Sequence, residues 1–545
     1  MKASLILSIT FAFLAIVNPA FYPPWSGFVS EYLFFFAFIF LLPLFGRTGL
    51  SAPKVSTFFL VISIIPLVQY LSGQIVYLDT ALLSFIYLLF FWLAVLVGYS
   101  SIHNYRHSLD YFFGTFLACG LLSCGIAFLQ WASIYVSPDW MMAAQSRPFA
   151  NMAQPNHLAT FLIIGLMGVL YFYSIQRINK FVLLLSSLVL LTGIAMTQSR
   201  TAWVALLFLY GLFSLSFYYK KTTLSIKKQT GLLIYFVTCA LFLPVIQKNL
   251  IGVTGRTAIE RASSGHERIQ IWQQAIDAIL QRPLFGYGWN QSSFAQFDTV
   301  KEGYLTHYLT SFHNIILDIL IWCGIPIGIG IIIVSAFFYF KLLFSAKNTI
   351  QLCLIGSVSA VLIHALLEYP LSYVYFLLPV GYMLGCLFAF DKNINKKIVI
   401  KGRYVLIACL FSTVSMIYIF IEYSHIPDNM VAAETHEMNE RRDAVSLPYR
   451  SYLFESFDQR ARWIAQYPCM TLSPSQIIDA ENMTKSYLIF YDLEKFAKVL
   501  YFNNKQEQAQ SILKKFNHMY DKQYTLDDLN CDGIGEIAEH QVYVE

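Results

Sequence analysis

Long apolar runs, separated by short polar breaks, make up most of the first 422 residues of the chain. A helix needs about 20 mainly apolar residues to cross the hydrocarbon core of a bilayer. By that measure the runs predict about thirteen transmembrane helices, at approximately residues 3–18, 28–45, 55–72, 80–99, 109–136, 157–174, 181–197, 202–219, 230–247, 313–340, 349–367, 371–390 and 404–422. Asn18-Pro19 follows the first run in place of a small-residue cleavage site, so we expect that run to be an uncleaved span.

Basic residues fall in alternate connections between these runs. With residue 1 inside, the connections on the cytoplasmic side are short and basic, at 47–54, around Arg106, and at 177–180, 220–228, 341–347 and 392–403. On the opposite side, 18–27 and 72–79 contain no Lys or Arg, and 137–156 contains only Arg147. Because Lys and Arg concentrate in cytoplasmic loops, the pattern predicts a multi-pass protein of the bacterial inner (cytoplasmic) membrane.

Two large polar segments fall on the predicted periplasmic side. The pattern divides the chain into an N-terminal transmembrane bundle (1–247), a large periplasmic loop with an amphipathic helix (248–312), C-terminal transmembrane helices (313–422) and a periplasmic, mostly helical domain (423–545). Within the last domain, the apolar spacing from Ser486 to Tyr520 predicts two amphipathic helices around Asn503-Asn504. The expected fold is therefore all-α and polytopic, with a helical C-terminal domain.

Composition supports a membrane protein and excludes a nucleic-acid partner. Hydrophobic residues make up 57% of the 545 residues, charged residues 13%, and the mean hydropathy is +0.56. Soluble globular chains carry about 25% charged residues. The net charge is only +5, and there is no basic tract of the kind that binds nucleic acid.

Seven of the nine cysteines lie in predicted spans, where cysteine packs as a small apolar residue. Cys469 and Cys531 lie in the C-terminal domain, and the periplasm permits disulfides. A Cys469–Cys531 bond and two free thiols are both open on the sequence alone.

Five polar clusters lie at the predicted outer face of the membrane, and each also has an ordinary structural explanation. The clusters are, in order, Arg147 to His157, Thr197 to Thr201, Gly265 to Gly288, His313-Asn314, and His364 to Tyr373. The first can be explained as a capped helix start, the second as an arginine that reaches the membrane interface, and the third as a solvated arginine. The fourth can be explained as an interfacial histidine and the fifth as a helix-breaking re-entrant element.

Taken together, the clusters indicate one outward-facing site. Ionisable groups at membrane depth are costly and usually line a cavity or a site. Guanidinium groups match phosphate oxygens, and histidine is suited to general-base work near neutral pH. The chain has no Cys/His metal spacing and no Gly-rich phosphate loop on the cytoplasmic side, so we expect a donor activated elsewhere, such as a lipid-diphosphate glycan.

The order of these motifs resembles that of a known family. TQSRT, then R-x-x-x-W with PLFGYG, then HN-x-x-L and H-x-x-x-E resemble the bacterial O-antigen ligase and polymerase superfamily. The block QPNHLAT, the stretch IPLVQYLSG and the C-terminal domain are similar to the PglL-like protein O-oligosaccharyltransferases, including the pilin-type enzymes.

This resemblance implies a GT-C-like fold and an enzyme with a periplasmic active site. The implied reaction moves a preassembled glycan en bloc from undecaprenyl-diphosphate to a serine or threonine hydroxyl of a periplasmic, pilin-like protein. It is metal-independent and needs no cofactor, and its partners are the lipid-linked glycan, the acceptor protein and the lipid of the inner membrane.

The resemblance also implies roles for individual residues. His313 matches the essential loop histidine, which would deprotonate or orient the acceptor hydroxyl, and Arg200 and Arg268 match the arginines that bind the donor diphosphate. Gln154 matches the glutamine of the QPN block, and Tyr369 or Tyr373 the tyrosine after H-x-x-x-E. The neighbouring polar residues of these motifs complete the expected substrate site, and they are Asn156, His157, Asn314, His364 and Glu368.

Two alternatives remain open for the function. A lipid A core O-antigen ligase or an O-antigen polymerase would share the arginine and histidine motifs. A lipid-linked glycan flippase or other transporter belongs to a different class, and it should place ionisable residues near the middle of several spans.

A second site is possible near the C-terminus. Asp528, Asn530, Asp532 and Glu539 follow the spacing of a calcium-binding loop. Gly535 stands where such loops usually carry an apolar residue, and an ordinary polar turn explains the segment as well.

Overall fold

The computed structural model describes residues 2–144, 147–252, 266–301, 304, 307–391 and 397–530. Each predicted span falls on an apolar helix, and these helices are α1 (Lys2–Val17), α2 (Phe28–Ile39), α3 (Thr57–Leu71), α4 (Leu78–Asn104), α5 (Ser108–Trp131), α6 (Pro155–Ser174), α7 (Lys180–Met196), α8 (Arg200–Tyr218), α9 (Ile226–Ile251), α13 (Ile315–Ser345), α14 (Thr349–Ala365), α15 (Val374–Phe390) and α16 (Gly402–Ser424). Within the described residues, nine helical segments are long and apolar enough to cross a membrane. The chain is thus a predominantly helical, multi-pass membrane protein, and the count of thirteen spans stays a prediction, because α1, α7, α14 and α15 are shorter.

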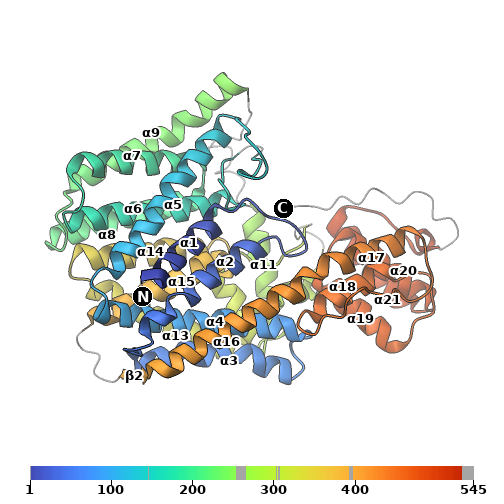
Figure 1. Cartoon of the computed structure of the whole chain (residues 1–545). Helices are drawn as coiled ribbons and strands as arrows, with labels where there is room; N and C mark the ends of the chain where they lie inside the picture. The colour runs from blue at the N-terminus through green and yellow to red at the C-terminus, as the bar shows by residue number, and fades with distance from the viewer. Residues whose placement is uncertain are drawn as a thin grey trace.

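A helical lobe stands beyond one end of this bundle, at the far end of α16 (Figure 1). Its helices are α17 (Ile426–Met438), α18 (Glu455–Ala465), α19 (Pro474–Ser486), α20 (Phe490–Phe502) and α21 (Gln506–Tyr520), followed by the short helix η4 (Leu526–Leu529). Helices α20 and α21 meet at Asn503 and Asn504, which confirms the amphipathic pair expected from the sequence. We call residues 426–530 the C-terminal lobe.

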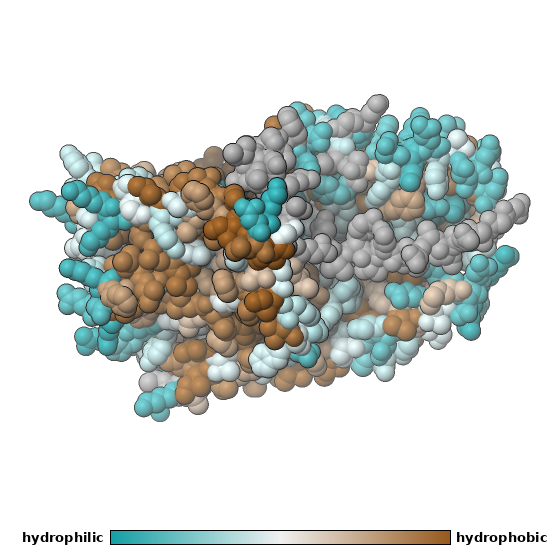
Figure 2. Space-filling model, turned by 90° about the horizontal axis from the view of Figure 1, so that it is seen from above, coloured by the Kyte–Doolittle hydropathy of each residue, from teal (hydrophilic) through white to brown (hydrophobic). Residues whose placement is uncertain are grey.

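The surface divides in the way that a membrane requires. Hydrophobic side chains cover the bundle, between hydrophilic side chains at its free end and those of the C-terminal lobe (Figure 2). Soluble proteins rarely expose apolar patches larger than a few hundred Å². The apolar belt is therefore the surface that faces lipid.

The all-α expectation was wrong in one detail. Strands β1 (Leu50–Pro53) and β2 (Lys397–Ile400) pair antiparallel, with Leu50 opposite Ile400. The backbone of Ser51 exchanges two hydrogen bonds, of 2.8 and 3.0 Å, with the Ser100 hydroxyl of α4. Both strands belong to predicted cytoplasmic connections, and four residues are too few to show the alternation that predicts a strand.

Among the described residues, three large apolar cores and one small cluster in the C-terminal lobe, at Ala433, Ala461 and Ala465, hold the molecule together. The largest fills the bundle, and a second fills the C-terminal lobe around Phe496 and Phe516. The third joins α3, α4 and α13 to the helices of the large loop before α13, which are α11 (His266–Gln281) and α12 (Ser292–Thr299). The loop helices are therefore packed against the spans.

The C-terminal lobe is bound to the rest of the molecule by hydrogen bonds as well. The backbone N–H of Ser456 donates to Asp79 Oδ2 at the start of α4, at 3.2 Å, and the Ser456 hydroxyl donates to the same oxygen. Tyr308 Oη donates to the Ser486 carbonyl at 2.7 Å. These contacts attach the lobe to α4 and to the loop that precedes His313.

Candidate active site

The QPNH block ends in the first turn of α6. Asn156 bonds in two directions there: its Oδ1 accepts from the Ser199 hydroxyl at 2.7 Å, and its Nδ2 lies 3.4 Å from Glu368 Oε1. The loop before it is fixed by Gln130, whose Oε1 accepts from the backbone N–H groups of Phe149 at 3.0 Å and Ala150 at 2.7 Å. Asn156 thus connects its own cluster, Arg147 to His157, with the cluster that contains Ser199 and with the one that contains Glu368.

Ser199 caps the start of α8, with its hydroxyl accepting from the backbone N–H of Ala202 at 3.3 Å. Arg200 is the first residue of that helix and is exposed. The first turn of α8 therefore carries both the positive end of a helix dipole and an arginine, directly after the residue that bonds to Asn156.

The PLFGYG segment packs on a kink in α13. Gly324 has φ 73° and ψ 172° inside that helix, and the Tyr287 N–H donates to the Ile321 carbonyl at 2.7 Å. A side-chain Cβ at Gly286 would lie 2.3 Å from that carbonyl, and one at Gly324 would lie 2.4 Å from the carbonyl of Leu284. Glycine at both positions lets the two backbones touch, and this fixes α11, with Arg268, against α13.

Gln69, from the IPLVQYLSG stretch, holds the same junction. Its Nε2 donates to the Trp322 carbonyl at 2.8 Å, and its Oε1 accepts from the Trp289 N–H at 2.9 Å. One buried side chain of α3 thereby connects the kink of α13 to the segment after PLFGYG.

His313 lies in a tight turn before α13, with φ 54°. Its N–H donates to the Ser311 hydroxyl at 3.0 Å, and that hydroxyl donates to Asp318 Oδ2 at 2.6 Å. Asn314 caps α13 by accepting from the N–H groups of Ile316 at 3.0 Å and Leu317 at 3.4 Å. The amide of Asn314, predicted as part of the substrate site, is therefore directed at its own helix.

Glu368 is the centre at which the motifs meet. Its Oε2 lies 2.6 Å from His313 Nδ1, and its Oε1 accepts from Arg268 Nη2 at 2.6 Å. Burial raises the pKa of Glu368, but the hydrogen bond and the positive charge of His313, followed by the charge of Arg268, outweigh burial and lower that pKa from 4.5 to about 2. An ionised carboxylate only accepts, so Nδ1 of His313 carries the proton.

This arrangement leaves the other ring nitrogen for chemistry. Within the described part of the chain, His313 Nε2 makes no hydrogen bond. A carboxylate that holds one imidazole nitrogen orients the ring and stabilises its charged form. The site thus combines a carboxylate-backed histidine with Arg268, and Arg200 follows Ser199, which bonds to Asn156 of the same network. A histidine beside a guanidinium group fits group transfer from an anionic leaving group.

Comparison with known proteins identifies the family of the chain. Residues 181–333 match the O-antigen ligase family, residues 148–173 the protein glycosylation ligase family, and residues 352–527 the virulence factor membrane-bound polymerase, C-terminal family. The chain is 35% identical to the general O-oligosaccharyltransferase of Acinetobacter baylyi over 555 residues, which cover 96% of the chain and 94% of the relative. The chain belongs to the O-oligosaccharyltransferase family.

A second relative is similar over a shorter stretch. The ComP-specific O-oligosaccharyltransferase of Acinetobacter baylyi is 30% identical over 341 residues, which cover 61% of each chain. The protein is therefore a glycosyltransferase of the O-oligosaccharyltransferase type, as the motif order indicated.

In this O-oligosaccharyltransferase, two of the remaining predicted residues, His157 and His364, form a buried layer next to Glu368. His157 Nδ1 lies 2.9 Å from Tyr375 Oη, and His364 Nδ1 lies 2.9 Å from Thr160 Oγ1. Both histidines are almost completely buried, so they support the site from behind. Their Nε2 atoms and Gln154 Oε1, Gln198 Oε1 and Thr201 Oγ1 have no hydrogen-bond partner among the described residues.

The two predicted tyrosines take different places. The Tyr369 ring lies 5.2 Å from that of His313, and the Tyr373 ring lies 4.5 Å from that of His157, both edge to face. Tyr369 is therefore the tyrosine beside the candidate base, and Tyr373 packs on the buried layer.

One residue that the sequence analysis did not single out supports this layer. Glu31 of α2 is buried, and its Oε2 accepts from the Val374 N–H at 2.9 Å and from Tyr87 Oη at 3.0 Å. It thereby caps α15 directly after Tyr373, whose own side chain makes no cap. A carboxylate within an apolar run was the available signal.

The possible calcium loop lies apart from this site. Asp528 Oδ2 accepts from the N–H and the hydroxyl of Thr525, at 2.6 and 2.9 Å, in a capping box. Asp532, Glu539 and Cys531 lie outside the described residues, so the calcium loop and the Cys469–Cys531 bond stay predictions. Within the described ranges, no group of three potential ligands gathers for a metal.

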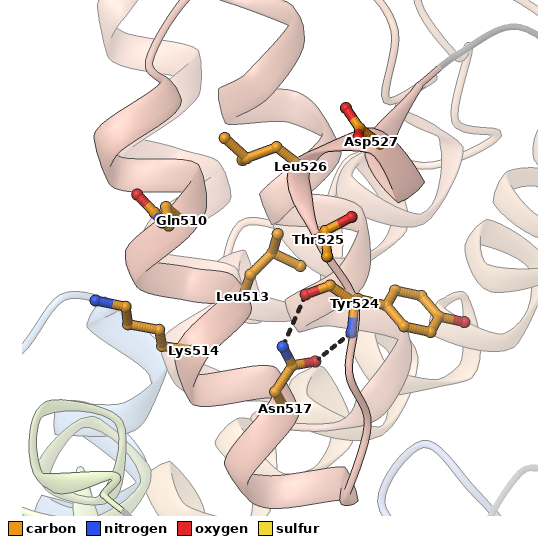
Figure 3. A pocket seen from close by; sticks show the side chains of 8 residues that line it. All are labelled: Gln510, Leu513, Lys514, Asn517, Tyr524, Thr525, Leu526 and Asp527. Atoms are coloured by element: carbon orange, nitrogen blue, oxygen red, sulfur yellow. Dashed lines mark hydrogen bonds between the residues drawn. The ribbon is translucent and has the colours of Figure 1, made fainter.

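The C-terminal lobe has a pocket of its own, between α21 and residues 524–527 (Figure 3). Asn517 closes one side by pairing with the backbone of Tyr524 through two hydrogen bonds of 2.8 and 2.9 Å. None of the site residues predicted from the motifs lines this pocket.

Proposed function

We propose that this enzyme transfers a preassembled glycan en bloc from undecaprenyl-diphosphate to a serine or threonine hydroxyl of a periplasmic, pilin-like protein. The observation that carries the proposal is the carboxylate of Glu368, which holds both His313 and Arg268 at 2.6 Å. One carboxylate thus holds a possible base, His313, and a possible phosphate-binding group, Arg268, next to each other.

His313 acts as the base in this proposal. Its Nε2 takes the proton of the acceptor hydroxyl while the hydroxyl oxygen attacks the anomeric carbon of the glycan. The bond from that carbon to the diphosphate oxygen breaks, and its electron pair leaves with undecaprenyl-diphosphate. Glu368 stabilises the imidazolium that forms, since it is already ionised and bound to Nδ1.

The two arginines offset the charge of the leaving group. Arg268 uses Nη2 for Glu368, and the rest of its guanidinium group can reach phosphate oxygens. Arg200 adds a second charge at the start of α8, where the helix dipole also favours an anion. This scheme needs neither a metal nor a cofactor.

The charge pattern supports an inner-membrane location with the site and the C-terminal lobe in the periplasm. Helix α11 lies on the side of the bundle nearer to the C-terminal lobe, and strand β2, which pairs with β1 in the basic connections, lies at the opposite end (Figure 1). Basic connections favour the cytoplasm. A donor assembled on lipid then meets the site from the outer leaflet.

A lipid acceptor is the second candidate, because residues 181–333 match the O-antigen ligase family. The two relatives, which are named for O-oligosaccharide transfer, favour a protein acceptor. Co-expression with a lipid-linked glycan pathway and a candidate pilin distinguishes the two. The proposal predicts a glycan-sized mass gain on the pilin that is absent for His313→Ala at equal membrane levels. If the pilin stays unmodified and the protein restores lipopolysaccharide ligation in a ligase-deficient strain, the acceptor is a lipid and the proposed protein acceptor is wrong.

A further inference from the structure

Helix α11 of the periplasmic loop is apolar on two sides. Its inner face packs on α3, α4 and α13 through Ile271, Ala275 and Ala278. Its outer side carries large apolar side chains that are between 51% and 70% exposed, and two more follow directly after the helix. The three in the helix are Ile269, Ile276 and Leu280, and the two after it are Leu284 and Phe285. We call these five residues the outer stripe.

The outer stripe continues the lipid-facing surface of the bundle. Gln74, just after α3, donates from Nε2 to the Phe285 carbonyl, so the stripe adjoins the end of α3. The last turns of α3 expose Val68 by 56% and Leu71 by 83%. On the other side of the same core, α13 exposes Ile327 by 43%.

The composition of α11 distinguishes it from a span. Glu267, Asp277 and Gln281 interrupt its apolar residues, and the helix has 16 residues. A helix with an apolar stripe beside charged residues lies in the interface plane, with its stripe about 5–10 Å into the boundary between headgroups and acyl chains. A stripe this apolar and continuous with a lipid-facing surface fits a bilayer better than it fits water.

We propose that α11 lies in the surface layer of the bilayer, with the outer stripe among the lipid headgroups and upper acyl chains. Arg268 lies on the inner side of the same helix, held by Glu368. The diphosphate of a polyprenyl-linked donor lies at the headgroup level, because its chain occupies the hydrocarbon core. The membrane contact of α11 therefore sets the depth at which Arg268 meets that diphosphate, a consequence that rests on the proposed function.

Photo-crosslinking tests the contact without any assay of transfer. The full-length protein carries p-benzoyl-phenylalanine at Ile276, in vesicles of phosphatidylethanolamine and phosphatidylglycerol. The matched control carries it at Ile478, an isoleucine of the C-terminal lobe with similar exposure, 57% against 51%. We expect a lipid-sized mass adduct at position 276 and none at 478. Equal adducts at both positions, or crosslinks at 276 to protein alone, would overturn the proposal, and the second result would indicate an acceptor on the stripe.

A kinetic comparison tests the consequence for Arg268. Leu280→Asp places a charge on the outer stripe, and Gln281→Asp places the same charge on a neighbouring exposed position beside it. We expect the KM for the lipid-linked donor to rise about tenfold in Leu280→Asp, which corresponds to the loss of about 1.4 kcal/mol of binding, and kcat to change little. Equal KM values in both variants would refute the claim that the membrane contact of α11 sets the depth of Arg268. They would not affect the crosslinking result. If the wild type transfers no glycan while the crosslinking variant gives a lipid adduct at 276, the proposed function alone is refuted.

Discussion

The Nδ1 atom of His313 lies 2.6 Å from the Oε2 atom of Glu368, and this contact joins the turn before α13 to the break between α14 and α15. The two ring nitrogens of His313 therefore have different roles. Nδ1, which is bound to the carboxylate, keeps its proton, and Nε2 remains able to accept one.

Glu368→Gln should therefore slow transfer at unchanged membrane levels. The amide is nearly isosteric but neutral, so it stabilises a histidine cation poorly. We expect the rate to fall about a hundredfold or more, within the range that general-base catalysis supplies. Single-turnover glycosylation measures this, with the exposed Glu434→Gln of α17 as the control. Equal rates for the two variants would exclude Glu368 from the mechanism.

Arg268→Lys should weaken the use of donor even though the charge is retained. Lysine cannot bind the carboxylate and a phosphate in the planar fork that arginine provides. We expect kcat/KM for the lipid-linked glycan to fall by about 10-fold, and by more in Arg268→Gln. Arg282→Gln is the matched control, because Arg282 is exposed and pairs only with Asp298, at 2.9 Å, among the described acids. An effect of the same size in both would indicate a loss of general surface charge.

Acid should remove part of the stability that Glu368 contributes. Its folded pKa, about 2, is lower than the ordinary value of 4.5, so between these values the unfolded chain binds more protons. The contribution, on the order of 3 kcal/mol, is complete above pH 4.5 and is lost as the pH falls toward 2. Thermal unfolding in detergent should show the advantage of the wild type over Glu368→Gln shrinking from pH 5 to pH 3. An advantage that grows on acidification would show that the pKa of Glu368 is raised in the folded protein.

Gly286→Ala should separate α11 from α13. The added Cβ would lie 2.3 Å from the Ile321 carbonyl, and the backbone has φ 71°. Overpacking of this kind costs about 1–3 kcal/mol. We expect a lower unfolding temperature and a reduced transfer rate, because Arg268 moves relative to His313. Gly330→Ala, also in α13, has open space around its Cβ and should behave as the wild type. A tolerated Gly286→Ala would refute the close approach.

Glu31→Ala and Glu31→Gln should differ from each other. The glutamine keeps an oxygen that can accept from the Val374 N–H, whereas alanine leaves that buried N–H and the Tyr87 hydroxyl unpaired. Leaving a buried group unpaired costs about 1–3 kcal/mol. We expect Glu31→Ala to lose stability and kcat together and Glu31→Gln to retain most of both. Unfolding temperatures and transfer rates of the purified variants decide this, and identical behaviour would mean that the cap is dispensable.

Elements that depend on local pattern could be predicted from the sequence. The apolar runs placed the membrane helices, and the spacing around Asn503 and Asn504 placed α20 and α21. The kink at Gly324 and the β1–β2 pair could not be found in this way. They depend on contacts between distant segments, such as Gly324 against Leu284 and Leu50 against Ile400.

The site could be predicted as a set of motifs but not as a geometry. The sequence predicted Asn156, His313 and Glu368 as site residues. Only the packing of α6, α13 and α14 shows that Asn156 and His313 both contact the Glu368 carboxylate. It also placed Asn314 in the substrate site, although a helix cap needs the same residue type. Which of two roles a polar residue takes depends on its neighbours in space.

The attachment of the C-terminal lobe has a consequence for the choice of acceptor hydroxyl. Asp79 and Ser456 join the lobe to α4, and Tyr308 joins it to the loop that leads to His313. These hydrogen bonds hold the C-terminal lobe at a fixed separation from the candidate base, His313. For an acceptor protein bound to the lobe, only hydroxyls at that distance from the bound segment would reach His313, and spacing, more than local sequence, would decide which hydroxyl receives the glycan.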